Sequence, residues 1–419
     1  MHHKYTLLSL AVGTALAAAW SPAAHAQNDG DKTPKNLDRI QVTGSAIRSV
    51  DIETQQPIVA ITRAMIEQQG FTTIADLLQN LTSTGAPTIS RARALASGEN
   101  VGGYYVNIRN LGATRTLVLV NGKRLGATTS GLQDLSQIPM SAVERIDVLK
   151  DGASSLYGSD AIAGVVNIIT RKNYEGLEVS MQHGQFSQGD GKDSTFSLVT
   201  GARGERGGYT LALEYQKSDP VFARDREFSR YGGAGPNYPG ADWSNISQNG
   251  SWCDPVLYKC NTGDAVFKTL NRGGDPKNPN DYHAITEDEV ANSNEQMTLL
   301  TGVKRKSLYI NGTYDFTDSI SLNTDVLYNE RQTFQQIAGY PYQSASKSIN
   351  TPLSADSAFN PVGQDVSFRR RLWEVPRTTE SKLKSLRVAP SLSGYFELGT
   401  KTYDWEVGAL FNRNEVTKT

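Results

Sequence analysis

Apolar and polar side chains alternate along much of the chain in a series of separate segments. In 209–216, aromatic residues and leucines occupy the odd positions, and mostly polar residues occupy the even ones. The same period of two returns at 177–182, 307–316, 320–328 and 403–411. Because successive side chains of a β-strand point to opposite faces, each segment is predicted to be a strand with one apolar and one polar face.

The connections between these strands are alternately short and long. Tight turns are expected at 203–206, 318–319 and 399–401, and long loops at 218–294 and 335–380. A soluble β-sandwich shows the same alternation, but short turns at one end and long loops at the other are typical of an outer-membrane barrel. The pattern therefore favours an antiparallel transmembrane β-barrel. About seven strands are present, whereas a barrel around a folded domain needs about 22, so we expect an incomplete barrel, either the N-terminal part of a longer receptor or a truncated product.

The residues before this series mix helix and strand signals. Short helices are expected at 63–69 and from residue 74 onward. Asn121-Gly122, between two apolar runs, is a strong hairpin signal. The segment 165–169 is apolar on both faces and must be enclosed on both sides, yet no long amphipathic helix follows it. A small α/β domain, with a mixed sheet and short helices, is predicted here.

The N-terminus has the pattern of a secretory signal peptide. A polar start is followed by an apolar run at 7–20 and by the small-x-small sequence Ala24-His25-Ala26. The alternative is a transmembrane anchor, for which the apolar run is short. Residues 1–26 are therefore predicted to direct export.

The charges are balanced, with 42 lysines and arginines against 43 aspartates and glutamates. This argues against a nucleic-acid partner, which would need a basic surface. After the leader only His183 and His283 remain, without metal-ligand spacing, and no nucleophile, zinc or phosphate-binding motif is present. The sequence therefore predicts neither an enzyme nor a metal or cofactor site.

The two cysteines, Cys253 and Cys260, both lie in the first long loop. A disulfide between them is expected, because an exported protein is oxidised. Two free thiols, or a soft metal site that lacks further ligands, are the alternatives.

Two stretches of the first domain resemble a known family. DGASSLYGSDAIAGVVNIITRK, preceded by VERIDVLK, resembles the end of the plug domain of TonB-dependent outer-membrane receptors, and VNIRNLGATRTLVLVNGKRL resembles its middle. Asn110 stands where the commoner pattern has glycine, and Lys150-Asp151-Gly152 replaces Arg-Gly-Pro. The resemblance implies a signal peptide (1–26), a flexible segment (27–47), a plug (48–172) and the first part of a transmembrane β-barrel (173–419).

The resemblance also implies a function. Members of this family lie in the outer membrane of Gram-negative bacteria and import scarce small-molecule ligands, powered by TonB and its inner-membrane motor. A ferric siderophore is the expected ligand, with an oligosaccharide, cobalamin or a peptide as alternatives. A soluble periplasmic β-rich binding module is the alternative of another class. A signalling transducer is disfavoured, because few residues precede Leu37 to form its extra domain.

A short alternating segment beside the flexible tail is a candidate TonB box, an extended peptide that adds as a strand to the energising protein. Its residues are Asp38, Arg39, Ile40, Gln41, Val42 and Thr43. The alternative is that this segment is the first strand of the plug.

By the same resemblance, two plug segments are expected at apices that face the ligand. The residues expected to contact it are Arg91, Arg93, Tyr104, Tyr105, Thr128 and Thr129. Arginines suit an anionic chelate, and tyrosines suit aromatic or sugar rings. The alternative is that both segments are merely mobile loops.

Charged residues on the plug are expected to pair with the barrel wall and hold the plug in place. Those chosen are Arg109, Glu144 and Arg145. The alternative is that these charges are only solvated. An ion pair on the surface contributes about 0–1 kcal/mol to stability, and a pair inside the barrel should contribute more.

Overall fold

The computed structural model describes residues 58–71, 73–81, 83–84, 91, 100–232, 243–253, 260, 266–344, 351–360 and 362–419. The predicted signal peptide, the candidate TonB box and Arg93 lie outside these residues. Within them, no helix is both long enough and apolar enough to cross a membrane.

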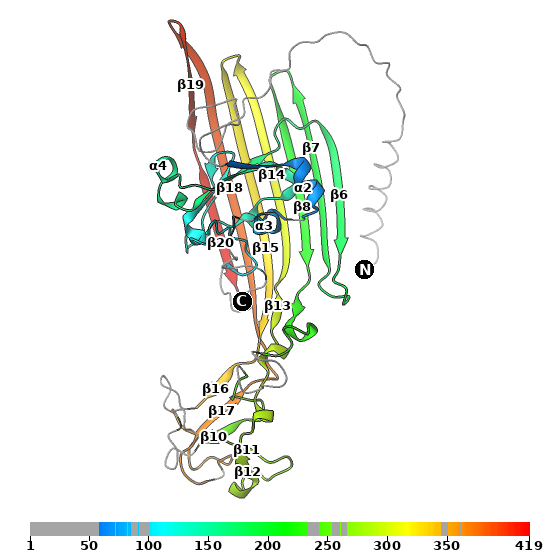
Figure 1. Ribbon diagram of the computed structural model, residues 1–419, viewed down its shortest axis with the longest axis vertical. Coiled ribbons are helices and arrows are strands. Elements are labelled where there is room, and N and C mark those ends of the chain that lie inside the picture. The colour runs from blue at the N-terminus through cyan, green and yellow to red at the C-terminus, as the bar shows by residue number, and fades with distance from the viewer. Residues whose placement is uncertain are drawn as a thin grey trace, which may run out of the picture. The chain divides into compact units, whose positions relative to one another are not determined.

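The first domain is built on a five-stranded mixed sheet, which we call the plug sheet (Figure 1). Its spatial order is β1-β4-β5-β2-β3, and only the β2–β5 pair is parallel. The strands are β1 (Ile58–Thr62), β2 (Thr116–Val120), β3 (Lys123–Arg124), β4 (Val143–Leu149) and β5 (Gly164–Thr170). β5 is central and buried on both faces, as its apolar sequence predicts.

Short helices accompany the plug sheet. They are α2 (Arg63–Gln69), α3 (Ile74–Gln79) and α4 (Ser154–Tyr157), with 3-10 turns η2 (Ala113–Arg115), η3 (Leu135–Gln137), η4 (Met140–Ala142) and η5 (Ser159–Ala161). Thr62 caps α2 by accepting a hydrogen bond from Met65 N–H, and Gly70 ends it in the left-handed conformation. Thr73 caps α3 in the same way. Asn121 and Gly122 both have positive φ, as the predicted two-residue hairpin requires.

The second part of the described chain is a long antiparallel sheet, which we call the wall sheet. Its strands are β6 (Gly176–Gly184), β7 (Asp193–Gly204), β8 (Gly207–Ser218), β14 (Gly302–Thr317), β15 (Ile320–Ile337), β18 (Arg377–Leu398), β19 (Lys401–Gly408) and β20 (Phe411–Lys418). β19 and β20 pair with successive halves of β18 and so share one position in the sheet. The wall sheet therefore has seven strand positions, in agreement with the predicted number. Within the described residues β6 pairs only with β7, so the sheet is open.

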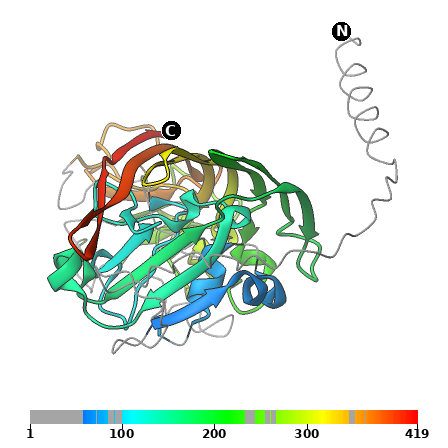
Figure 2. The ribbon, with the colours of Figure 1, turned by 90° about the horizontal axis from the view of Figure 1, so that it is seen from above.

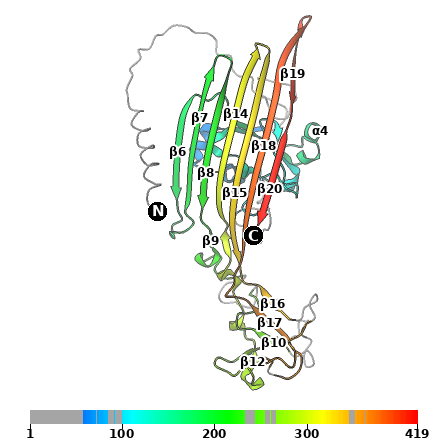
Figure 3. The same ribbon diagram turned by 180° about the vertical axis from the view of Figure 1, so that it is seen from behind.

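The wall sheet curves around one side of the plug sheet, as the view from above shows (Figure 2). Its burial pattern is the reverse of that in a soluble protein. On β8 the polar positions Thr210, Glu214 and Gln216 are buried, whereas Tyr209 is 49% and Leu213 is 41% exposed. The polar face of the wall sheet thus lies against the plug, and the apolar face points outward. Figure 3 shows the wall strands from the side away from the plug.

The sequence predicted only long loops at 218–294 and 335–380, but these segments contain regular β-structure. They combine into a five-stranded antiparallel sheet, which we call the loop sheet, in the order β12-β11-β10-β17-β16. Its strands are β10 (Ser251–Cys253), β11 (Lys268–Leu270), β12 (Tyr282–Ala284), β16 (Pro341–Gln343) and β17 (Ser367–Arg371). A disulfide joins Cys253 to Cys260, with 5.8 Å between the Cα atoms. Four of the five strands have three residues, too few to reveal a period of two.

Short elements connect the loop sheet to the wall sheet. A two-stranded ladder pairs β9 (Val221–Phe222) with β13 (Thr298–Leu300). The 3-10 turns of this region are η6 (Ala223–Asp225), η7 (Pro279–Asp281), η8 (Glu287–Glu289) and η9 (Ser293–Glu295).

Candidate functional site at the plug–wall interface

The turn around Ser136 is the centre of the contact between plug and wall. Asp134 precedes the 3-10 turn η3 and accepts hydrogen bonds from the backbone N–H groups of Ser136, at 2.9 Å, and of Tyr104, at 3.0 Å. These hydrogen bonds within the plug orient the Asp134 carboxylate independently of the wall. The Asp134 side chain is completely buried.

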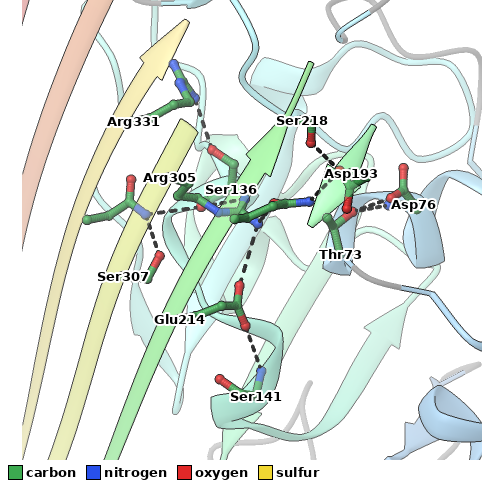
Figure 4. Close-up of polar contacts among 12 residues, drawn as sticks. Thr73, Asp76, Ser136, Ser141, Asp193, Glu214, Ser218, Arg305, Ser307 and Arg331 are labelled. Carbon is green, nitrogen blue, oxygen red and sulfur yellow. Dashed lines mark hydrogen bonds and ion pairs between the residues drawn. The ribbon is translucent and has the colours of Figure 1, made fainter. Parts of the chain in front are cut away.

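Two arginines of the wall sheet converge on this turn (Figure 4). Arg331 of β15 forms an ion pair with Asp134 and donates to Ser136 Oγ at 3.0 Å. Arg305 of β14 donates to the carbonyl oxygen of Ser136 at 3.0 Å. The two arginines are direct partners in the β14–β15 register, so two buried cations face each other across one strand pair. Like charges directly opposite are destabilising, and the plug supplies the acceptors that offset this repulsion.

Glu214 of β8 adds a second carboxylate, beside Arg305. Its Oε1 lies 3.6 Å from Arg305 Nη2, and its Oε2 accepts a hydrogen bond from Ser141 N–H at 3.2 Å. Ser141 belongs to η4, so the wall also holds the plug through a backbone donor.

A second polar cluster surrounds Asp325 of β15. The Asp325 carboxylate accepts hydrogen bonds from Asn121 of the plug hairpin, at 2.9 Å, and from Tyr309 of β14, also at 2.9 Å. The hydroxyl groups of Tyr309 and Thr170 lie 2.6 Å apart, which joins β14 to the last residue of β5. The plug hairpin is therefore fixed to the wall through hydroxyl and amide groups.

Arg387 of β18 binds only backbone acceptors of the plug. Its guanidinium donates to the carbonyl oxygens of Val120 and Arg124 at 3.2 Å and of Lys123 at 3.3 Å. These three carbonyls belong to the β2–β3 hairpin. Arg387 is 2% exposed, and it therefore caps the hairpin from inside the interface.

More exposed ion pairs lie toward the edges of the contact. Glu178 of β6 pairs with Arg171 at 2.9 Å and with Arg63 at 3.6 Å, and Lys123 pairs with Glu406 of β19 at 3.5 Å. Partly solvated pairs of this kind contribute about 0–1 kcal/mol each.

Among the described residues, Arg109 and Arg145 have their contacts within the plug, and the locking role of the three predicted residues stays a prediction. Arg145 pairs with Asp147 of its own strand at 3.1 Å, and Arg109 donates to the carbonyl oxygen of Ile162, also within the plug. Glu144 is exposed. Glu144 and Arg145 lie on β4 and Arg109 in a turn, whereas the buried contacts with the wall are made by Asp134, Ser136, Ser141, Thr170 and the β2–β3 hairpin.

The predicted ligand-contacting residues are also placed differently. Tyr104 and Tyr105 are 7% and 2% exposed, so neither ring is available to stack on a ligand in this structure, and the prediction is corrected. Burial raises the pKa of Tyr104 to about 12. Thr128 is buried and accepts a hydrogen bond from Leu132 N–H, whereas Thr129 is exposed.

Arg91 contacts backbone carbonyls and is not presented to solvent as a free cation. Its Nε donates to the carbonyl oxygen of Thr301 at 3.0 Å, and its Nη2 to that of Asp219 at 3.4 Å. Both acceptors flank ends of wall strands. Arg91 is therefore a contact between plug and wall.

The sequence held a signal for the true interface. Arg305, Arg331 and Arg387 all occupy the polar face of their strands, the face that also carries Ser307 and Asn329. An arginine that points into a barrel needs a hydrogen-bond acceptor inside it. The alternation of polar and apolar positions along each strand could therefore have identified these three arginines as contacts of the plug.

Comparison with known proteins identifies the class to which this arrangement belongs. Residues 50–165 match a family model described as the TonB-dependent receptor plug domain. The match spans the plug from before β1 to the start of β5. This part of the chain is therefore identified as a plug domain of the TonB-dependent receptor type. The predicted fold class, a plug followed by antiparallel barrel-type strands, is confirmed.

Similar proteins include one curated relative and several solved structures. The chain is 30% identical over 220 residues to the vitamin B12 transporter BtuB of Photobacterium profundum, an alignment that covers 52% of this chain and 34% of the relative. The siderophore receptor PiuA from Acinetobacter baumannii aligns with 87% of this chain and 46% of its own, at 17% identity and a TM-score of 0.41. A mutant of the ferric enterobactin receptor PfeA from Pseudomonas aeruginosa, in complex with enterobactin, aligns with 87% of this chain and 50% of its own, at 14% identity and a TM-score of 0.44. The chain thus spans about half or less of the length of these proteins.

Proposed function

We propose that the full-length protein imports a scarce small-molecule ligand across the outer membrane, driven by TonB and its inner-membrane motor. The observation that carries this proposal is the contrast between the two faces of the wall sheet. Its outer face is apolar and exposed, which suits outer-membrane lipid, and its inner face is polar and covered by the plug. Residues 38–43 act as the TonB box, through which TonB pulls on the plug.

The chemistry of the interface suits a plug that is held specifically and yet can be moved. A buried ion pair adds little net stability, because the cost of removing both charges from water offsets their attraction. When water enters the contact, Asp134, Arg305 and Arg331 regain hydration. A wholly apolar contact would instead lose about 25 cal/mol for each Å² exposed. The polar interface thereby lowers the work that TonB must do.

The ligand that we propose is a ferric siderophore. Arg305, Arg331 and Arg387 remain on the wall when the plug moves, and they offer charged hydrogen-bond donors to an anionic chelate. Cobalamin is the second candidate, because the curated relative is named a vitamin B12 transporter.

Uptake by intact cells tests this proposal. A deletion strain that carries the full-length gene should accumulate labelled ferric siderophore or labelled cobalamin, and the accumulation should cease when TonB is removed. Fractionation of the same cells should place the protein in the outer membrane. Uptake that does not depend on TonB, or recovery in the soluble periplasm, would instead support a periplasmic binding module.

A further inference from the structure

Two buried arginines of the loop sheet, Arg369 and Arg371, have no acidic partner among the described residues, and Arg369 is the one with few other contacts. Arg369 lies in β17, between β10 and β16, and is 8% exposed. Its guanidinium stacks 3.2 Å from the centroid of the Phe267 ring, and its Nε donates to Ser251 Oγ at 3.1 Å. Among the described residues, no carboxylate pairs with it.

Arg369 differs from its neighbours in how few of its guanidinium nitrogens are hydrogen-bonded to described residues. Arg371, on the same face of β17, donates to the carbonyl oxygens of Ile246 and Gly339 and to Ser244 Oγ. Arg370, on the other face, pairs with Glu374 at 2.8 Å. The contacts of Arg369 with described residues use only Nε and the face of the guanidinium, which leaves the two Nη groups for another acceptor. Burial lowers the pKa of Arg369 to about 10, as expected of a cation without a counter-charge.

A pocket of about 500 Å³ opens beside this side chain. Arg369 lines it together with mainly apolar residues, among them Phe267, Ile285 and Val290. Cys260 also lines it, so the disulfide fixes one side. Glu287 is the acidic residue among the described lining residues, and it is exposed to solvent. The volume lies within the range of about 300–1,000 Å³ that is typical of small-molecule sites.

We propose that this pocket binds a small molecule that carries a carboxylate on an apolar ring or chain, with the two Nη groups of Arg369 binding the carboxylate. End-on Nη1 and Nη2 match the two oxygens of a carboxylate, and Nε is already occupied by Ser251. The apolar residues of the lining receive the body of the ligand. The inference deepens the proposed function, because it assigns to the loop sheet a capture site for a carboxylate-bearing import ligand. The binding step can be measured without transport.

The test uses 4-fluorobenzoate as the probe and fluorine NMR to follow its binding to the full-length protein in detergent. The wild-type protein should bind 4-fluorobenzoate, and should bind the neutral analogue 4-fluorobenzamide about tenfold more weakly or worse. Arg369→Gln should weaken binding of the carboxylate by about tenfold or more and leave binding of the amide unchanged. Arg369→Lys keeps the charge and loses the planar fork, so it should give an intermediate affinity.

Arg370→Gln is the matched control, because it removes an arginine from the adjacent position of the same strand but outside the pocket. It should bind 4-fluorobenzoate as the wild type does. Equal binding of the carboxylate and the amide by the wild-type protein, or no binding of either, would overturn the proposal even if Arg369→Gln failed to fold. This experiment measures binding and not uptake. A lack of 4-fluorobenzoate binding would therefore not contradict the proposed import, and a lack of uptake would not contradict the proposed binding site.

Discussion

Arg305 and Arg331 lie directly opposite each other on β14 and β15, and both guanidinium groups are held by the turn at Asp134 and Ser136. The wall therefore carries a repulsive pair that is neutralised only in part from within the wall, by Glu214. The Asp134 carboxylate of the plug supplies the remaining negative charge. Docking of the plug and the local stability of the wall are coupled through these charges.

Removal of the Asp134 charge should loosen the plug. Asp134→Asn keeps the shape of the side chain but leaves Arg331 buried without its anion, which costs about 3–5 kcal/mol. Adding Arg331→Gln should recover part of this loss, with a coupling energy of about 0.5–3 kcal/mol. Hydrogen exchange of residues 134–143 in the full-length protein measures both effects. Arg109→Gln, an exposed change within the plug, is the control, and strict additivity of the two interface variants would contradict the pairing.

The hydroxyl group of Tyr309 should contribute to the stability of the docked plug, although Tyr309 lies on a strand of the wall. It contacts both Thr170 and Asp325, so Tyr309→Phe leaves buried polar groups without a partner and should destabilise plug docking by about 1–3 kcal/mol. Protease sensitivity of the plug in the full-length protein provides the measurement. Tyr314→Phe, on the same strand but exposed, should be neutral, and equal effects of the two changes would refute the contact.

The proposed TonB box leads to a prediction that separates ligand binding from transport. Val42→Pro removes a backbone donor from the strand that residues 38–43 are proposed to add to TonB. Energised uptake should cease while ligand still binds to whole cells. Ile40→Pro should act in the same way. Normal uptake by either variant would exclude this segment as the TonB box.

The turn between β6 and β7 should open at low pH. Asp190 accepts hydrogen bonds from Arg226 at 2.8 Å and 2.7 Å, and these lower the pKa of its carboxyl group below 3.8. A carboxyl whose pKa is lowered on folding stabilises the turn above its unfolded pKa, and this stabilisation is lost as the pH falls through the lower folded pKa. Protection of the Phe186 and Gly189 amides against hydrogen exchange should therefore fall below about pH 4. In Asp190→Asn the protection should be low at every pH, and a wild-type profile in that variant would rule out the pair.

The open edges of the wall sheet set an expectation for residues 27–419 expressed alone. An unpaired strand edge in lipid leaves backbone groups unsatisfied, each at a cost of several kcal/mol. Refolding in detergent should give aggregate or a loose sheet that does not show heat-modifiable migration. A closed, protease-resistant barrel from this segment would contradict that expectation.

The wall strands were predictable because each has two different environments, which impose a period of two on the sequence. The loop sheet was not, because β10, β11 and β12 are too short to show any period. Asn110 illustrates a third case. It has a φ of 58°, a conformation that glycine adopts freely and asparagine tolerates, and so it can replace the glycine of the commoner family pattern.

Within the site, the sequence predicted the kind of contact, whereas the contacts between plug and wall in the described residues involve other side chains. Arg109, Glu144 and Arg145 carry charge on the plug, but whether a charge crosses an interface depends on the neighbouring chain segment, which spacing does not reveal. Tyr104 and Tyr105 follow two glycines and were expected at a mobile apex. Their neighbours Val106 and Ile108 are buried, and this apolar run was the sign that the segment enters the core.

The contacts of Arg387 have a consequence for how such proteins diverge. Its three acceptors are main-chain carbonyls, which every amino acid provides. Substitutions in the β2–β3 hairpin can therefore accumulate without a matching change in the wall, provided that the turn keeps its shape. The Asp134–Arg331 contact has no such freedom, because it depends on both side chains. Among homologous receptors, the first contact should persist through sequence drift, and the second should change only by paired replacement.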